Sequence, residues 1–170
     1  MENQLNFFIF LKTFFKVITM NKELTEEIGY KWFEIMWSKP DLELANEIVD
    51  PQYNPSWIHI DAVGPAQVKH EIKYFRSLFP DLTYKIVDMI GLADKVWIRY
   101  KASATHQGRG WGFEATNKRV EFEGATILYI NSKGKVYDRW GAFCFYDIFA
   151  ELGTVPPFHE LSKYLSDFKQ

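Results

Sequence analysis

The sequence predicts an α+β domain in which a run of helices precedes an antiparallel sheet. Apolar residues recur every three or four positions in the first half of the chain and alternate with polar residues in much of the second half. Helices followed by consecutive strands are typical of the α+β class. A chain of 170 residues is one domain's worth and can bury a substantial core.

Three helices are expected in the first half of the chain, over residues 22–38, 42–49 and 66–79. The first ends at the break Lys39-Pro40-Asp41, and a loop over residues 50–64 that contains two prolines precedes the third. The third helix has an apolar stripe that should face the core. This stripe consists of Val68, Ile72, Phe75 and Leu78.

Four strands and two further helices are expected after residue 80. Turns rich in glycine, asparagine and aspartate separate the strands that should pair. The expected strands are residues 82–91, 95–106, 119–131 and 135–143. A helix over residues 145–152 ends at Gly153, a common helix-stop residue, and a shorter helix covers residues 158–168.

The first nineteen residues differ from the body of the chain. They are apolar and aromatic, but their apolar core is too short for a signal peptide or a bilayer span. A conventional helix start follows at Met20, with Asn21 as its cap. We therefore expect a leader over residues 1–19, docked as a helix or outside the fold, a domain over residues 20–153 and a helical tail over residues 154–170.

The composition excludes several classes of function. A formal net charge of −2 gives no electrostatic footprint for nucleic acid or an anionic membrane. Cys144 is the only cysteine, which excludes an intrachain disulfide and a thiolate metal cage and favours a reducing cytoplasm. Phosphate-binding glycine loops, a serine nucleophile elbow and a dinucleotide fingerprint are absent from the sequence, so no cofactor is expected.

Two of the expected strands place polar groups on faces that are otherwise apolar. His106 shares a face with the apolar residues of the second strand and should point inward. Asp138 shares a face with Cys144 and would be a buried carboxylate if that face points inward. Each has a structural alternative, namely a hydrogen-bonded core histidine for His106 and an ion pair with Arg99 or Arg139 for Asp138.

Several segments between about residues 24 and 153 follow one another as they do in a known family. They are Trp32 to Leu42, Gly64-Pro65, Phe79-Pro80-Asp81-Leu82, Thr105-His106-Gln107-Gly108, Gly134-Lys135-Val136 and Leu152-Gly153. In this order and spacing, the chain resembles the SnoaL-like polyketide cyclases and ester cyclases of the nuclear-transport-factor-2-like superfamily.

This resemblance implies a cone-shaped, curved antiparallel sheet wrapped around the N-terminal helices, with a deep apolar pocket, and commonly a homodimer. The activity it implies is cofactor-free intramolecular aldol closure of a polyketide, in which one acid/base group moves a proton. The family's acid/base aspartate lies four residues after the tryptophan of the last strand. Counted from Trp140, that position is Cys144 here. Asp147, Asp138 or His106 could compensate.

The catalytic candidates are therefore His106, Asp138 and Cys144, and His106 is the most able to titrate near neutral pH. The residues expected to contact a substrate are His59, Trp57, Tyr100, Trp111, Trp140 and Asp147. A metal site formed by His59, Asp61 and His106 is conceivable. However, the sequence lacks the HxH and HExxH spacings, and no metal is expected.

Three functions remain open at this stage. A cofactor-free cyclase or isomerase would act on an apolar, carbonyl-bearing polyketide or terpenoid. A carrier would bind a hydrophobic small molecule without turnover, which the loss of the family's aspartate favours. An interaction module would fill the cavity with its own side chains. We further expect a homodimer formed through the outer face of the sheet, where Trp97 and Tyr129 lie, without nucleic acid or membrane as a partner.

Overall fold

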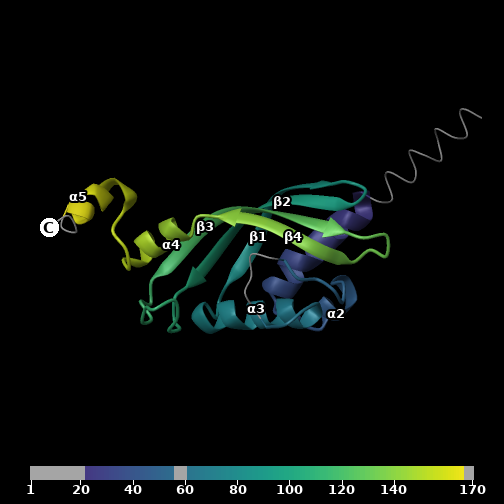
Figure 1. The fold of residues 1–170 in the computed structure, drawn as a ribbon, viewed down its shortest axis with the longest axis horizontal. Helices are drawn as coiled ribbons and strands as arrows, with labels where there is room; N and C mark the ends of the chain where they lie inside the picture. The colour runs from purple at the N-terminus through teal and green to yellow at the C-terminus, as the bar shows by residue number, and fades with distance from the viewer. Residues whose placement is uncertain (1–21, 56–60, 167–170) are drawn as a thin grey trace, which may run out of the picture.

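A four-stranded antiparallel sheet lies over a layer of helices, and the last helices extend from one end of the sheet (Figure 1). The computed structural model describes residues 22–55 and 61–166. The sheet is curved and unclosed, which confirms the predicted α+β class. The predicted leader over residues 1–19 and the candidate residues Trp57 and His59 lie outside the described residues.

The first helix changes its winding as it approaches the core. Residues 22–30 are α-helical and continue directly into the π-helix η1 (Lys31–Trp37), whose buried residues include Trp32 and Phe33. Two helices then follow close to their expected positions, α2 (Leu44–Ile48) and α3 (Pro65–Leu78). The proline at the start of α3 suits a helix N-terminus, where its missing N–H costs nothing.

The four strands pair in sequence order and lie within a few residues of their expected positions. They are β1 (Thr83–Gly91), β2 (Lys95–Thr105), β3 (Arg119–Ile130) and β4 (Val136–Phe143). Alternate residues of β2, from Val96 to Ala104, are buried against the helices, as the period-two pattern predicts. His106, just beyond β2, is 1% exposed, which confirms its inward position.

A β-bulge reverses the expected faces of β4. Tyr129 pairs with Asp138, and Ile130 pairs with Val136, so Tyr137 is an extra residue in β4. Beyond this bulge, Arg139 is buried, while Asp138 and Trp140 are exposed on the outer face. The prediction of a buried Asp138 is therefore wrong. An inserted residue shifts the strand by one position, so every side chain after it lies on the opposite face from the one that alternation from Val136 predicts.

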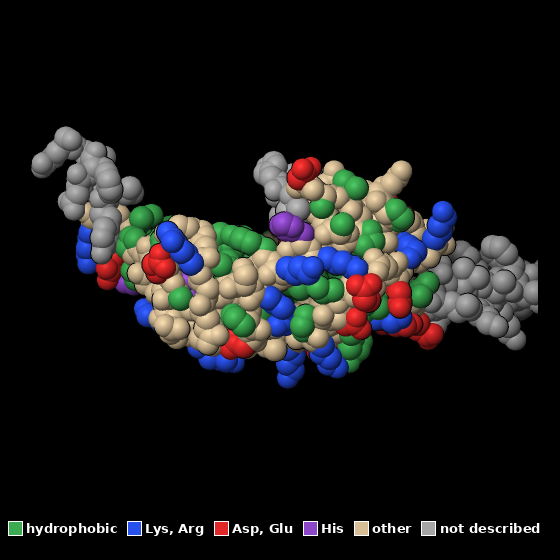
Figure 2. All heavy atoms as spheres, turned by 90° about the horizontal axis from the view of Figure 1, so that it is seen from below, with side chains coloured by type: hydrophobic (Ala, Val, Ile, Leu, Met, Phe, Trp, Pro, Cys, Tyr) green, Lys and Arg blue, Asp and Glu red, His purple; other side chains and the backbone are tan. Residues whose placement is uncertain are grey.

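The C-terminal part continues from the end of β4. It consists of α4 (Phe145–Leu152), η2 (Phe158–Glu160) and α5 (Leu161–Ser166). Gly153 ends α4 with a φ of 77°, as expected for a left-handed helix stop. Seen from the helix side, acidic and basic side chains are interspersed over the surface (Figure 2), in keeping with a net charge near zero.

Candidate functional site

A small inner cavity lies between the helices and the inner face of the sheet. Its volume is about 40 Å³, and one water molecule occupies about 30 Å³ in the liquid. Most of its wall consists of the rings of Phe33, Trp37, Phe75, Phe122 and Phe143. The polar part of its wall consists of Glu71, Tyr84, Tyr100, Thr126 and Arg139. The cavity is small because aromatic side chains fill the space between the layers.

A buried ion pair forms one side of this cavity. Nη2 of Arg139 in β4 lies 2.6 Å from Oε1 of Glu71 in α3, and the two side chains are 7% and 6% exposed. The guanidinium carbon of Arg139 also lies 5.5 Å from the ring centroid of Trp32, a cation–π distance. Burial alone would lower the pKa of Arg139, but the Glu71 carboxylate more than offsets this effect and raises it above its ordinary value.

Two local features of the sequence bring this pair together. Gln67 and Glu71 lie one turn apart on α3, beside the apolar stripe, and both are buried. The bulge in β4 turns Arg139 toward them instead of Asp138. The interior position of both charges therefore depends on the helix period and on a single inserted strand residue.

Several buried polar atoms beside the ion pair have no hydrogen-bond partner within the described part of the chain. They are Nε1 of Trp32, the hydroxyl of Tyr53, both polar atoms of the Gln67 side chain and Oε2 of Glu71. With Arg139, these residues form what we call the polar cluster. The rings of Trp32 and Tyr53 are 6.1 Å apart, and burial raises the pKa of Tyr53 above its ordinary value, against the opposing effect of the Arg139 charge. Of these residues, Glu71 and Arg139 line the inner cavity, whereas Trp32, Tyr53 and Gln67 do not.

The tyrosines of the inner cavity stay protonated at neutral pH. Burial raises the pKa of Tyr100 to about 12, against the opposing effects of Arg139 and a hydrogen bond with Thr126. Burial likewise raises the pKa of Tyr84 well above its ordinary value. Gly124 makes room for the Tyr100 hydroxyl, since a Cβ at that position would collide with it. Two neutral O–H groups thus line the cavity that holds the Glu71 carboxylate.

His106 lies apart from this cavity, although it is fully buried. Its ring packs 5.3 Å from that of Phe79, and its Nδ1 lies 3.2 Å from the Thr116 hydroxyl. Nε2 has no hydrogen-bond partner among the described residues. Burial lowers its pKa, so the neutral ring is favoured. Among the described residues, His106 lines neither the inner cavity nor the groove described next.

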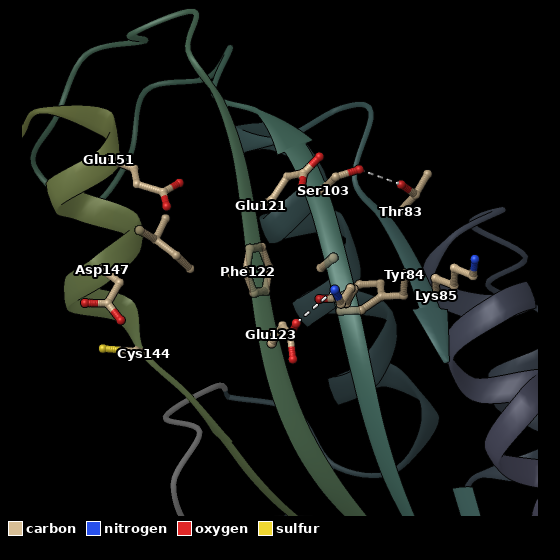
Figure 3. A pocket seen from close by; sticks show the side chains of 13 residues that line it. Thr83, Tyr84, Lys85, Ser103, Glu121, Phe122, Glu123, Cys144, Asp147 and Glu151 are labelled. Atoms are coloured by element: carbon tan, nitrogen blue, oxygen red, sulfur yellow. Dashed lines mark hydrogen bonds and ion pairs between the residues drawn. The ribbon is translucent and has the colours of Figure 1, made fainter. Parts of the chain in front are cut away.

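A larger, open groove runs between α4 and the neighbouring ends of β1, β2 and β3 (Figure 3). Its volume is about 490 Å³, and it contains the predicted site residues Cys144 and Asp147. Much of its lining is charged and comes from the outer face of the sheet. These charged residues are Lys85, Lys101, Glu121, Glu123, Asp147 and Glu151.

The other predicted site residues are divided between regions. Tyr100 lines the inner cavity, as stated above, and Trp140 lies on the outer face, where it is 48% exposed. Trp111 belongs to an aromatic cluster outside both cavities, and its ring lies 5.4 Å from that of Phe149 in α4. The structure thus does not bring His106, Asp138 and Cys144 into one site.

Sequence reasoning missed Glu71 and misplaced Arg139. The signal for Glu71 was its spacing of four residues from Gln67, and of three from Val68, at the edge of the apolar stripe. The alternative ion pairs for Asp138 are also wrong, because Arg99 pairs with Glu123 at 2.6 Å and Arg139 pairs with Glu71. Among the described residues, no group of three or more His, Cys, Asp or Glu side chains could hold a metal.

The sequence matches the model of the SnoaL-like polyketide cyclase family over residues 27–152. The chain therefore belongs to this family of α+β proteins, as the ordered segments of the sequence predict. No curated protein sequence matches the chain. Within the described residues, no helix has the length and apolar character needed to cross a bilayer.

Similar solved structures support the same fold. TsrD from Streptomyces laurentii superposes with a TM-score of 0.71 at 17% identity, covering 78% of this chain and 97% of that chain. A SnoaL-like polyketide cyclase from Agrobacterium tumefaciens gives 0.64 at 15% identity, with coverages of 76% and 98%. AclR from Streptomyces galilaeus, whose proposed activity is that of a hydroxylase, gives 0.63 at 23% identity, with coverages of 82% and 99%. At these identities, the likeness establishes the fold alone.

Proposed function

We propose that this protein is a cofactor-free cyclase or isomerase that acts on an apolar, carbonyl-bearing polyketide or terpenoid by acid/base proton transfer. The observation that supports this most is the inner cavity, where a buried carboxylate and two protonated tyrosines interrupt an aromatic wall. Membership of the SnoaL-like polyketide cyclase family favours the same class of reaction.

The chemistry of such a reaction is modest. A base removes a proton next to a carbonyl, hydrogen-bond donors stabilise the enolate oxygen, and the proton returns to another atom. An apolar wall holds the substrate folded for attack and excludes water. The inner cavity supplies each of these groups without a metal or cofactor. The hydroxylase proposal for AclR illustrates that a shared fold does not by itself fix the reaction.

Of the three residues proposed as catalytic from the sequence, only His106 is buried. Its Nε2 has no hydrogen-bond partner among the described residues. His106 is the alternative proton carrier in this proposal. Asp138 and Cys144 are exposed, and Cys144 lies in the outer groove together with Asp147. A catalytic role for Cys144 would require the substrate to bind at the outer groove instead, whereas Asp138 lines neither the groove nor the inner cavity.

The second candidate function is a carrier of a hydrophobic small molecule. It is favoured by Cys144, which stands where the family's cyclases have their acid/base aspartate. A thiol in place of a carboxylic acid is a poor reversible proton shuttle near neutral pH. In this case, the aromatic rings of the inner cavity would provide binding area alone.

One experiment separates the two functions. Purified protein is incubated with a panel of linear polyketide methyl esters and terpenoid ketones, and the products are analysed by mass spectrometry and NMR, while binding is followed by tryptophan fluorescence. A cyclase or isomerase yields products of unchanged mass and altered connectivity. Binding without any new product would contradict the enzymatic proposal and support the carrier.

We also propose a cytoplasmic homodimer that pairs through the outer face of the sheet. A row of apolar side chains crosses all four strands there, in register, and consists of Ile90, Trp97, Ile127 and Trp140. Trp97 in β2 and Trp140 in β4 lie on either side of Ile127 and are 45% and 48% exposed. Exposed apolar side chains that lie together in this way often mark a protein–protein interface. Light scattering at micromolar concentration should give the mass of a dimer, and Trp97→Lys should give a monomer. A monomeric wild type would contradict this proposal.

A further inference from the structure

We infer that Glu71 is the catalytic acid/base residue of the proposed cyclase or isomerase, with Arg139 as its positioning partner; this inference rests on the proposed function. Glu71 lies on α3, away from the end of the last strand where the family's aspartate would be replaced by Cys144. It is thus a catalytic group that neither the strand pattern nor the family resemblance predicts.

The two carboxylate oxygens of Glu71 have different surroundings. Oε1 accepts a hydrogen bond of 2.6 Å from Nη2 of Arg139. Oε2 is buried and has no partner among the described residues. Glu71 also lines the inner cavity. We therefore assign the fixing of the carboxylate to Oε1 and the exchange of the proton to Oε2.

A purely structural ion pair would have different features. Buried pairs are stable when further hydrogen bonds satisfy their remaining polar atoms, because desolvation of two charges is costly. Here the polar cluster leaves Oε2 of Glu71, the Tyr53 hydroxyl and the Gln67 amide without partners in the described part of the chain. Because buried polar groups nearly always have partners, the bare Oε2 of Glu71 is the feature that a purely structural pair would lack.

The proton donors for the other half of the reaction lie in the same cavity. Tyr84 and Tyr100 line it with Glu71, and burial keeps both phenols protonated. Their ring centroids are 5.2 Å apart, and the two residues lie on the neighbouring strands β1 and β2. Such donors stabilise an enolate oxygen as its negative charge develops.

The proposed step needs no further reactant. The Glu71 carboxylate takes a proton from the carbon next to a substrate carbonyl, and the electron pair of that C–H bond forms the enolate. In a cyclase, the enolate carbon forms a C–C bond to a second carbonyl carbon, and the resulting alkoxide takes the proton back from Glu71. In an isomerase, a different carbon of the enolate receives the proton.

The cavity volume restricts which part of a substrate reaches Glu71. With about 40 Å³, the cavity admits a carbonyl and its adjacent carbon, whereas a larger substrate requires an aromatic ring of the wall to turn. Phe122 and Phe143 are both half-buried and have ring centroids 5.8 Å apart. A small ketone is therefore a suitable first probe of Glu71.

The test measures proton abstraction directly. Deuterium exchange at the carbons next to the carbonyl of cyclopentanone is followed by NMR in D₂O, with wild type, Glu71→Gln and Glu71→Asp. Glutamine keeps the shape and the hydrogen bond to Arg139 but cannot act as a base. We expect Glu71→Gln to lose on the order of a hundredfold or more of the protein-catalysed rate. Glu71→Asp, which keeps a carboxylate, should recover part of it.

His106→Asn is measured in the same assay as the test of the alternative proton carrier. Glu47→Gln is the matched control, because it makes the same change at an exposed carboxylate of α2 that lies outside the cavity lining. Both variants should keep the exchange rate within about threefold of wild type. If Glu71→Gln does not fold by circular dichroism, Glu71→Gln combined with Arg139→Met removes both charges, a replacement that buried pairs often tolerate. That double variant should fold and should also lack exchange.

The outcomes separate this inference from the proposed function. If wild type exchanges deuterium or cyclises a polyketide ester and Glu71→Gln does so equally well, Glu71 is not the base and the enzymatic proposal stands. If His106→Asn loses the activity and Glu71→Gln keeps it, the proton carrier is His106. If wild type catalyses neither exchange nor cyclisation, the proposed function fails, and the inference fails with it.

Discussion

The inner cavity and the outer groove differ in nearly every property that a binding site can have. The groove is more than ten times larger, at about 490 Å³ against 40 Å³. Its carboxylates are exposed, and Glu123 is paired with Arg99 and Lys101 at the surface. The cavity holds one carboxylate, which is buried, paired on one oxygen and unpartnered on the other within the described residues.

The volume of a pocket is therefore a poor guide to its chemistry in this fold. Exposed charges are screened by water, so the groove's carboxylates behave as ordinary surface groups. In the cavity, burial of Glu71 and Arg139 strengthens the electrostatic interaction between them. The proton transfer that we propose is therefore assigned to the smaller, buried site.

The largest expected effect concerns the stability of the two regions. Glu71→Ala removes the carboxylate that pairs with the buried Arg139, and we expect a loss of about 3–5 kcal/mol in the free energy of unfolding. Glu123→Ala removes an exposed carboxylate of the groove and should leave the stability nearly unchanged. Urea denaturation followed by circular dichroism measures both. Equal effects of the two substitutions would contradict the distinction between buried and surface charge.

A second prediction compares how substitutions in the cavity and in the groove change the affinity for a ketone. Phe143 lines the cavity and not the groove, whereas Ile148 lines the groove and not the cavity. Phe143→Ala should raise the affinity for acetophenone about tenfold, since newly buried apolar groups contribute roughly 0.8 kcal/mol per methylene. Ile148→Ala should not raise it. Fluorescence titration gives both dissociation constants, and the reverse ranking would place the ligand in the groove.

A third and smaller effect concerns pH. Burial lowers the pKa of His106 in the folded state below the unfolded value of about 6.5. The neutral ring therefore contributes stability that is fully present above that pH and is lost as the pH falls toward the folded pKa. Between pH 7.5 and 5.5, wild type should lose more stability than His106→Gln. Parallel losses in the two proteins would show that His106 is not responsible.

Much of the fold could be predicted from the sequence because its periodicities are local. The apolar stripe of α3 and the alternation of β2 gave helix and strand positions within a few residues, and the Gly153 helix stop is confirmed. His106 was correctly placed on the inner face, because no irregularity interrupts β2 before it. In each case, a single repeating pattern decided the position.

The candidate site could not be predicted in the same way. One extra residue at Tyr137 exchanges the two faces of β4. The alternation of apolar and polar residues in this strand does not indicate the insertion. As a result, Asp138 was expected inside and Arg139 outside, the reverse of what is observed. Glu71 was overlooked because a charged residue beside an apolar stripe is usually exposed, and its burial depends on a partner 68 residues away.

The most direct test of the account asks where an apolar ketone binds. Acetophenone is titrated into ¹⁵N- and methyl-labelled wild type and Phe143→Ala, and the NMR shifts are mapped onto the structure. We expect the signals of the inner cavity to move, above all those of Thr126 and Gly141, and to move further in Phe143→Ala. Shifts confined to Ser103, Glu121 and Asp147 of the outer groove, with the inner cavity unchanged, would contradict it.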